Sequence, residues 1–281
     1  MTFEELKELL LKYNSFVITT HVNPDADALG SEIAMYYILQ QYNKNVRIIN
    51  YSKIPENLVF MGEGINIEKY DSEIHNTIIK NVDVVIFVDL NSISRTKGME
   101  NAIRESNCVK ICIDHHEYPE NFTNNMYVNP KSCSTGEIIY NFINETKICS
   151  VDLNIANVLY AAIMTDTGSF RYDRTTSHTH RIIAEFLDLG VVPYKLHDLI
   201  YDNSSFGKTK LLGEVLSNLQ INDSKNVCYM VITSEMLNRL NVEESEVDGF
   251  VNYNLSIKGI LVGILFLELA SLFIYLTFCF L

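Results

Sequence analysis

The fold class of this chain is indicated by residues 82–88, which read VDVVIFV and are followed by Asp89. An apolar run of this length, interrupted only by Asp83, is typical of a strand that is covered on both faces. Residues 109–113 (VKICI) have the same character, and the shorter runs 16–20 (FVITT) and 46–49 (VRII) predict two more strands. The chain therefore contains several buried strands that suit the middle of a sheet.

Helical patterns alternate with these strands. Apolar residues recur at helical spacing over about 28–42, 135–145, 153–164 and 177–189, and Gly190 stands where a helix commonly ends. A further helix begins after Thr2, which forms a capping box with Glu5. This alternation predicts an α/β fold with a doubly wound, mainly parallel sheet. Ligand sites of such sheets gather at the carboxyl ends of the strands.

The chain is expected to form two domains. Residues 1–190 carry the strands and helices just described, and the polar segment 191–205, which contains Pro193, is expected to be a linker. Residues 206–281 predict a smaller α/β unit with a helix near 209–219, a strand at 227–233 and another near 259–267. A chain of 281 residues is long enough for this organisation.

Composition limits the function. The formal net charge of −13 argues against a protein that coats long nucleic acid, although bound cations would still allow a short anionic substrate. The six cysteines are scattered without a CxxC pair, and the acidic amphipathic start of the chain does not resemble a secretory leader. We therefore expect free thiols in a reducing cytoplasm.

Carboxylate and imidazole side chains follow the predicted strands. The turn after residues 16–20 holds His21, Asp25 and Asp27, Asp89 follows the strand 82–88, and the triplet Asp114-His115-His116 follows 109–113. Each group has a simpler interpretation, since Asp25 or Asp27 could cap a helix and a histidine near a core edge is often structural. Taken together, the groups are expected to converge at one edge of the sheet.

Asp166 completes this set. It lies where a helix stops before Gly168, and the negative end of a helix dipole is unfavourable for an unpaired anion unless a cation offsets it. Oxygen and nitrogen ligands without a thiolate favour hard or borderline ions and disfavour a structural zinc site. We therefore predict two bound cations, Mn²⁺ above all, with Mg²⁺ or Co²⁺ as alternatives. The predicted ligands are His21, Asp25, Asp27, Asp89, His115 and Asp166.

The ordered motifs resemble the DHH superfamily of phosphoesterases. The matching series is His21-x3-Asp25-x-Asp27-x2-Gly30-Ser31, Asp89, Asp114-His115-His116 and Thr165-Asp166-Thr167-Gly168. It is most similar to the nanoRNase and pAp-phosphatase branch, whose members hydrolyse very short oligonucleotides and 3′-phosphoadenosine 5′-phosphate (pAp). The resemblance covers roughly residues 1–267, and it implies a two-metal phosphoesterase in which a hydroxide shared by the ions attacks phosphorus.

The resemblance also implies individual roles. His21, Asp25 and Asp89 would hold one ion, while the other would be held by a set that shares Asp89. That second set is Asp27, Asp89, His115 and Asp166. Asp114 would orient a histidine, and His116 would face the substrate phosphate or the leaving oxygen as an acid or electrostatic stabiliser.

Other polar residues near these motifs could contact the substrate. Ser134 and Thr135 open a predicted helix, and Ser134 is expected to form a capping box with Glu137, although free N–H groups at a helix start can also bind phosphate. Arg95 and Arg171 follow Asp89 and Asp166 in sequence, and both could instead be solvated surface arginines.

Four alternative functions stay open. A phosphodiesterase acting on cyclic di-AMP or pApA shares the catalytic core, usually behind membrane and sensory segments. A family II pyrophosphatase would have a second domain rich in lysine and arginine, and a RecJ-like exonuclease would be longer with a basic groove. The chain could also bind metal but be catalytically weak.

The end of the sequence departs from the family. Residues 248–268 look like the start of a DHHA1-type substrate-binding domain, but neither a basic strand nor a glycine-rich turn ending in histidine appears before Leu281. We expect an altered or truncated end that leaves the second domain incomplete and prone to aggregation. The apolar run 259–281 is long enough to cross a bilayer, but Glu268 near its middle makes a membrane anchor the less favoured reading. A homodimer is a further expectation.

Overall fold

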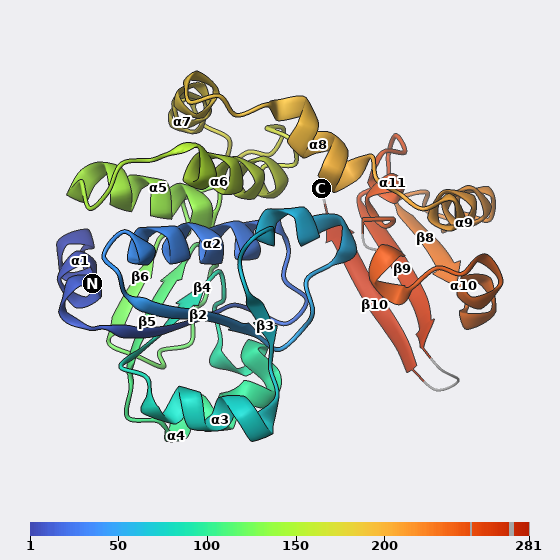
Figure 1. Ribbon diagram of the computed structural model, residues 1–281. Helices are drawn as coiled ribbons and strands as arrows, with labels where there is room; N and C mark the ends of the chain where they lie inside the picture. The colour runs from blue at the N-terminus through green and yellow to red at the C-terminus, as the bar shows by residue number, and fades with distance from the viewer. Residues whose placement is uncertain (248, 270–272, 281) are drawn as a thin grey trace. The chain divides into compact units, whose positions relative to one another are not determined.

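The computed structural model describes residues 1–247, 249–269 and 273–280. It divides into two compact units, Met1–Tyr201 and Asp202–Leu281, which we call the N-terminal and the C-terminal unit (Figure 1). Each unit has its own sheet and its own apolar core. Expectations for residues 270–272 and 281, within the apolar tail, lie outside the described residues.

The N-terminal unit is built on a six-stranded sheet in the order β3-β2-β1-β4-β5-β6, and all of its strand pairs are parallel. The strands are β1 Ser15–Thr19, β2 Asn45–Asn50, β3 Ile67–Lys69, β4 Val84–Val88, β5 Val109–Asp114 and β6 Asn125–Val128. β4 is buried along its whole length and lies between β1 and β5. The parallel α/β fold predicted from the apolar runs is therefore confirmed.

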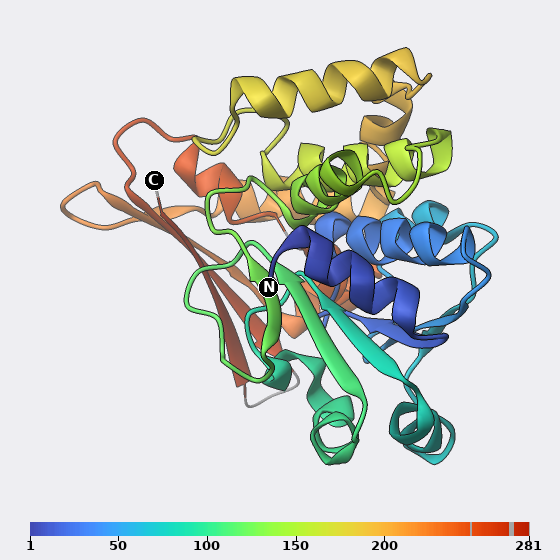
Figure 2. The same cartoon turned by 90° about the vertical axis from the view of Figure 1, so that its left-hand side faces the viewer.

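Helices cover both faces of this sheet (Figure 1, Figure 2). One face carries α1 Phe3–Lys12, α2 Ala26–Gln40, α5 Thr135–Thr146 and α6 Leu153–Asp166, with α7 Ser177–Asp188 and α8 Pro193–Tyr201 packed beyond them. The other face carries α3 Ser72–Asn81, α4 Glu100–Glu105 and the 3-10 segment Ile93–Met99, while a second 3-10 segment, Glu56–Gly62, packs against α2 and α8. Two apolar clusters, one on each face, bury the sheet.

Local capping explains where the helices begin and end. Thr2 and Glu5 form the predicted capping box, and the Asp25 side chain accepts a hydrogen bond from the N–H of Ala28 at the start of α2. Gly190 has φ of 103° directly after the residue that caps α7. These ends were visible in the sequence because the capping residues act within one turn of the helix.

The segment 191–205, which the sequence suggested as a linker, is largely helical. Helix α8 occupies Pro193–Tyr201, and its Leu196 and Ile200 are buried in the core of the N-terminal unit. The Asn57 side chain also donates a hydrogen bond to the carbonyl of Ile200 (3.0 Å). The charged residues of α8, Lys195 and Asp198, are exposed.

The C-terminal unit contains a four-stranded sheet in the order β10-β9-β8-β7. Its strands are β7 Gln220–Ile221, β8 Val227–Ile232, β9 Val262–Leu269 and β10 Phe273–Phe280, and its helices are α9 Phe206–Ser217, α10 Ser234–Leu240 and α11 Asn252–Leu255. A short 3-10 turn, Glu244–Val247, precedes α11. Strands β8 and β9 are parallel, and the other pairs are antiparallel. Much of the apolar tail therefore forms a β-hairpin.

No helix in residues 1–247, 249–269 and 273–280 combines the length and the apolar character that crossing a bilayer requires.

Candidate metal centre

The predicted ligands come from the carboxyl ends of three neighbouring parallel strands and from two helix ends. His21 follows β1, Asp89 follows β4, and His115 follows β5. The first turn of α2 contributes Asp25 and Asp27, and α6 ends at Asp166. Because β1, β4 and β5 are adjacent and parallel, their carboxyl ends meet at one edge of the sheet, as the sequence predicted.

Asp89 lies at the centre of this arrangement. Its Oδ2 is 3.4 Å from Nε2 of His21, and its Oδ1 is 3.4 Å from Nε2 of His115. The residue has a left-handed backbone with φ of 57°, and its N–H donates to the carbonyl of Ile113 (3.0 Å). A non-glycine residue held in this conformation at the end of a buried strand is typical of a functional turn.

Two sets of side chains face the two oxygens of Asp89. Nε2 of His21 is 3.9 Å from Oδ2 of Asp25. Nε2 of His115 is 3.1 Å from Oδ2 of Asp166 and 3.8 Å from Oδ2 of Asp27. In each of the groups His21–Asp25–Asp89 and Asp27–His115–Asp166, the potential ligand atoms all lie within 4.8 Å of one another. Both groups therefore offer the carboxylate and imidazole donors that divalent cations take, and Asp89 lies 3.4 Å from a histidine of each group.

Burial of several carboxylates at one place perturbs their protonation. Burial, together with the charges of Asp89 and Asp166, raises the pKa of Asp27 well above its ordinary value. Burial and the charge of Asp89 raise the pKa of Asp166 to about 8. Burial alone would raise the pKa of Asp89 as well, but hydrogen bonds from His115 and His21 hold it well below the usual range. Such crowding is costly without cations and is common where metals bind.

The pKa values of the two histidines are also raised. Burial by itself lowers the pKa of His115, but its hydrogen bond to Asp89 and the charge of Asp166 outweigh burial and raise that pKa to about 8. Burial also lowers the pKa of His21, but its hydrogen bond to Asp89 and the charge of Asp25 outweigh burial and raise that pKa. Nδ1 of His21 lies 2.9 Å from the carbonyl of Val22, which fixes the proton of a neutral ring there and leaves Nε2 as the ligand nitrogen.

The start of helix α5 holds Asp27 in place. The N–H groups of Thr135 and Gly136 donate to the two oxygens of Asp27 at 2.7 and 2.8 Å. The Thr135 hydroxyl also donates to Oδ1 of Asp89 (3.0 Å). A Cβ at Gly136 would lie 2.7 Å from Cβ of Ala162 and 3.3 Å from Oδ1 of Asp27, so a side chain there would disturb this contact.

Ser134 and Thr135, considered above as substrate contacts, are fully buried. The N–H groups that could have received a phosphate donate instead to protein carboxylates, and the Ser134 hydroxyl accepts from the N–H of Glu137 (3.0 Å). The capping-box prediction is corrected in one respect, because the Glu137 carboxylate accepts from the N–H of Cys133 (2.9 Å) rather than from that of Ser134. The carboxylate reaches one residue beyond the helix cap.

Asp114 and His116 form a close pair beside this cluster. Nδ1 of His116 lies 2.7 Å from Oδ1 of the buried Asp114, and 3.6 Å from Oδ1 of Asp89. A third of the His116 side chain is exposed, whereas Asp114 is inaccessible to solvent. With Nδ1 engaged by Asp114, Nε2 is the nitrogen left to meet a ligand. His116 also falls within one potential ligand group, with Asp89 and His115.

Arginines surround the cluster in different ways. The charge of the half-buried Arg95 is close enough to His21 to oppose the rise in the His21 pKa. Arg171 is exposed, and its Nε donates to the carbonyl of Gly168 (2.8 Å) in the turn after Asp166. Arg174, which the sequence did not single out, opposes the rise in the Asp166 pKa and pairs with Glu117 at 3.3 Å. No local pattern marks Arg174, since the turn brings it back toward Asp166.

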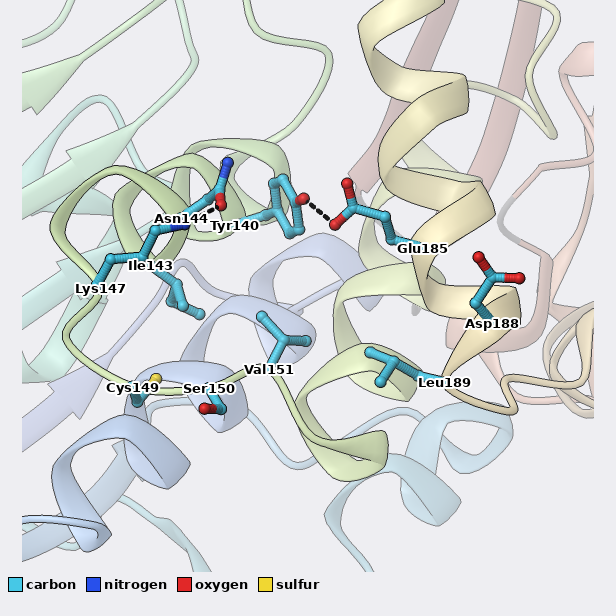
Figure 3. A pocket seen from close by; sticks show the side chains of 10 residues that line it. All are labelled: Tyr140, Ile143, Asn144, Lys147, Cys149, Ser150, Val151, Glu185, Asp188 and Leu189. Atoms are coloured by element: carbon cyan, nitrogen blue, oxygen red, sulfur yellow. Dashed lines mark hydrogen bonds between the residues drawn. The ribbon is translucent and has the colours of Figure 1, made fainter.

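A cavity of about 430 Å³ lies elsewhere in the N-terminal unit (Figure 3). It is lined by the end of α5, the loop before α6 and the end of α7, and no predicted site residue faces it. The Tyr140 hydroxyl bonds to Glu185 there, and Nζ of Lys147 donates to Oδ1 of Asn144 (2.6 Å). Asp166 is at the other end of α6, and the N–H groups that bond to Asp27 are at the other end of α5, so this cavity is separate from the candidate centre.

Comparison with known proteins agrees with this geometry. The protein-family model described as "DHH family, N-terminal domain" matches residues 15–163 of this chain. The chain belongs to the DHH family. This matched region contains all the predicted ligands except Asp166, which lies just beyond its end.

Individual DHH proteins extend the similarity over nearly the whole chain. The probable bifunctional oligoribonuclease and PAP phosphatase NrnA of Streptococcus mutans is 26% identical over 96% of this chain and 82% of its own length. The Bacillus subtilis protein of the same name is 24% identical over 94% of this chain and 81% of its own length. A crystal structure of an exopolyphosphatase-related protein from Bacteroides fragilis superposes with a TM-score of 0.94 at 29% identity, covering 99% of this chain and 83% of that one. The chain is thus a hydrolase of the DHH phosphoesterase kind.

Proposed function

We propose that this protein uses two divalent cations, Mn²⁺ above all, to hydrolyse short oligonucleotides, pAp, or both. The observation that carries the proposal is the placement of Asp89 between two groups of ligand atoms. The names of the Streptococcus mutans and Bacillus subtilis relatives support this choice of substrates. Carboxylate and imidazole ligands without a thiolate support Mn²⁺, with Mg²⁺ or Co²⁺ as alternatives.

The residues that would hold the ions follow from the two ligand groups. His21, Asp25 and Asp89 would hold one ion. The other would be held by Asp89 together with Asp27, His115 and Asp166. When bound, two such ions supply Lewis acidity toward phosphoryl oxygens and a water of lowered pKa.

The protein's own groups prepare this chemistry. The N–H groups of Thr135 and Gly136 fix the orientation of the Asp27 carboxyl group, so Ser134 and Thr135 act in positioning. Asp114 accepts the Nδ1 proton of His116, which directs Nε2 of His116 toward the substrate. There His116 would protonate the leaving oxygen or stabilise its negative charge. Asp114 maintains the imidazole in that orientation throughout the reaction.

The surroundings favour a small anionic substrate. Arg95 and Arg174 lie close enough to the cluster to affect its pKa values, and the exposed Arg171 follows Asp166. We propose that these arginines meet the phosphate groups. A net charge of −13 disfavours a long nucleic acid strand, whose many phosphates would need an extended basic surface. Free thiols at five described cysteines are compatible with a cytoplasmic location.

Metal content and substrate choice test the proposal. Protein stripped with a chelator and reconstituted with Mn²⁺ should hold about two ions per chain, and Asp89→Ala should lose both. A panel of pAp, a dinucleotide, cyclic di-AMP, pyrophosphate and a long single strand, each with Mn²⁺, should give fastest hydrolysis of pAp or the dinucleotide. Preference for pyrophosphate or the long strand would overturn the assignment, and preference for cyclic di-AMP would favour the alternative phosphodiesterase function.

A further inference from the structure

A buried carboxyl group lies behind the candidate metal centre and belongs to neither ligand group. Glu32 is in helix α2, five residues after Asp27, and its side chain is completely buried. Its Oε2 accepts a hydrogen bond from Nδ2 of Asn50 (2.8 Å), and its Oε1 has no partner among the described residues. Buried polar groups without a full set of hydrogen bonds are rare in folded proteins, so a buried acid near a functional site needs an explanation.

Asn50 extends this contact to the strand end that carries His21. Asn50 is the last residue of β2 and is itself buried. Its Oδ1 accepts from the backbone N–H of Thr20 (3.3 Å) and from the hydroxyl of Thr19 (3.4 Å). Thr20 immediately precedes His21, so this single amide fixes the backbone at the end of β1.

Thr20 extends the hydrogen-bond network to β4, the strand that Asp89 follows. Its hydroxyl donates to the carbonyl of Val88 (2.8 Å), the residue directly before Asp89. A continuous buried chain of hydrogen bonds therefore runs from Glu32 through Asn50 and Thr20 to Val88. It joins the helix bearing Asp25 and Asp27 to the two strand ends bearing His21 and Asp89.

The protonation of Glu32 suits this arrangement. Burial raises the pKa of Glu32 to about 8, because the amide of Asn50 compensates only part of the lost hydration. At neutral pH the group is mainly a neutral acid, so it accepts from Asn50 without adding another negative charge to the cluster. A glutamine in its place would have the same shape, the same acceptor and no charge.

We propose that Glu32 and Asn50 are positioning residues, which keep the metal ligands of α2 and those that follow β1 and β4 at fixed distances from one another. This inference rests on the proposed two-metal function. Glu32 acts through Asn50, and Asn50 acts through the backbone of Thr20. Outer hydrogen-bond partners of metal ligands commonly contribute about 10–100-fold to metal affinity. The effect should therefore appear as a change in metal binding, and not only as a change in stability.

The test measures Mn²⁺ affinity of the full chain by isothermal titration, together with thermal unfolding. Glu32→Met removes the acceptor and Glu32→Gln keeps it, while Asn50→Leu removes all three hydrogen bonds made by the amide. Thr146→Val is the matched control, since its buried hydroxyl donates to the carbonyl of Phe142 (2.7 Å) near the end of α5, away from the metal ligands. Thr20→Val removes only the bond to Val88 and preserves side-chain shape.

We expect Glu32→Met and Asn50→Leu to bind Mn²⁺ about tenfold more weakly or worse, and Glu32→Gln to stay within about threefold of the natural chain. Thr146→Val should lower the unfolding temperature without changing affinity. Unchanged affinity in Glu32→Met and Asn50→Leu, or equal weakening in Glu32→Gln or Thr146→Val, would overturn the inference. If the larger changes prevent folding, Thr20→Val decides, with weaker binding expected and unchanged binding contradicting us. A natural chain that binds no Mn²⁺ would refute the proposed function itself.

Discussion

Asp89 illustrates what one residue contributes to this centre. Its left-handed backbone turns the chain at the end of β4, and its two oxygens face His21 and His115. The sequence located Asp89 because a carboxylate follows a continuous apolar strand. It could not reveal that Thr135 and Gly136 bond to Asp27, because those contacts join residues more than a hundred positions apart.

The protonation of His115 and Asp166 predicts that metal affinity depends on pH. Both groups have a pKa raised to about 8, and their side chains are 3.1 Å apart. Below that pH the metal-free pair holds at least one proton that a cation must displace, and above it the proton is absent. Mn²⁺ affinity should therefore fall about tenfold per pH unit below about 8 and level off above it. Titration calorimetry in buffers of different ionisation enthalpy counts the protons released. Equal affinity at about pH 6.5 and about pH 8.5 would contradict this expectation.

His116 predicts a separation between catalysis and metal binding. Because Nδ1 of His116 is engaged by Asp114, we assign Nε2 to the substrate. His116→Ala should lower kcat about 100-fold or more while leaving nearly the full metal content. Asp114→Asn should lower kcat less, since the imidazole remains. Metal analysis beside steady-state kinetics checks both variants, and loss of an ion from His116→Ala would make His116 a ligand, as its proximity to Asp89 and His115 allows.

Elements differ in how far the sequence could define them. Strands β4 and β5 were predictable because burial on both faces leaves an apolar run, and α2 was predictable because Asp25 caps it. The edge strands β3 and β6 contain no fully buried residue and thus carry no such pattern. Helix α8 lies in the segment that was expected to be a linker, and its buried Leu196 and Ile200 dock it. Whether these elements form depends on packing between segments that are distant in the sequence.

The crossing of α2 and α6 gives a prediction at the scale of elements. A Cβ on Gly30 would lie only 2.4 Å from the carbonyl oxygen of Val158, so the two helices touch backbone to backbone there. Gly30→Ala should force them apart and destabilise the N-terminal unit by about 1–3 kcal/mol or more. Because α2 carries Asp25 and Asp27 and α6 carries Asp166, Mn²⁺ binding should weaken too.

Gly213→Ala is the control for this change. Gly213 lies in the interior of α9, and a Cβ there would meet no atom within 4 Å. Alanine at an open helical position should stabilise the C-terminal unit by about 0.5–1 kcal/mol and leave Mn²⁺ affinity unchanged. Denaturant unfolding and metal titration of both variants provide the comparison. Equal effects from the two substitutions would exclude close helix packing as the cause.

At the scale of the whole molecule, the two units have separate cores and only one holds the candidate metal centre. All six predicted ligands belong to Met1–Tyr201, whereas the core of the C-terminal unit is formed by residues such as Leu211, Met230 and Leu267. Strand β9, which supplies Leu265 and Leu267 to that core, comes from the apolar run that hydropathy alone left open to a membrane reading. Strand β9 pairs with β8 in parallel, so this part of the apolar run belongs to a sheet.

This separation predicts that metal binding and a mutation in the C-terminal core change the stability of different units. Mn²⁺ at about 100 times its dissociation constant should stabilise the N-terminal unit by about 2.7 kcal/mol, because the ions bind only its folded state. Leu267→Ala should destabilise the C-terminal unit by about 2–5 kcal/mol through the cavity that it leaves. In scanning calorimetry of the full chain, we expect Mn²⁺ to raise one transition and Leu267→Ala to lower the other, with unchanged Mn²⁺ affinity. A single transition that both changes shift equally would mean that the units unfold together, and the independence argued from their cores would be wrong.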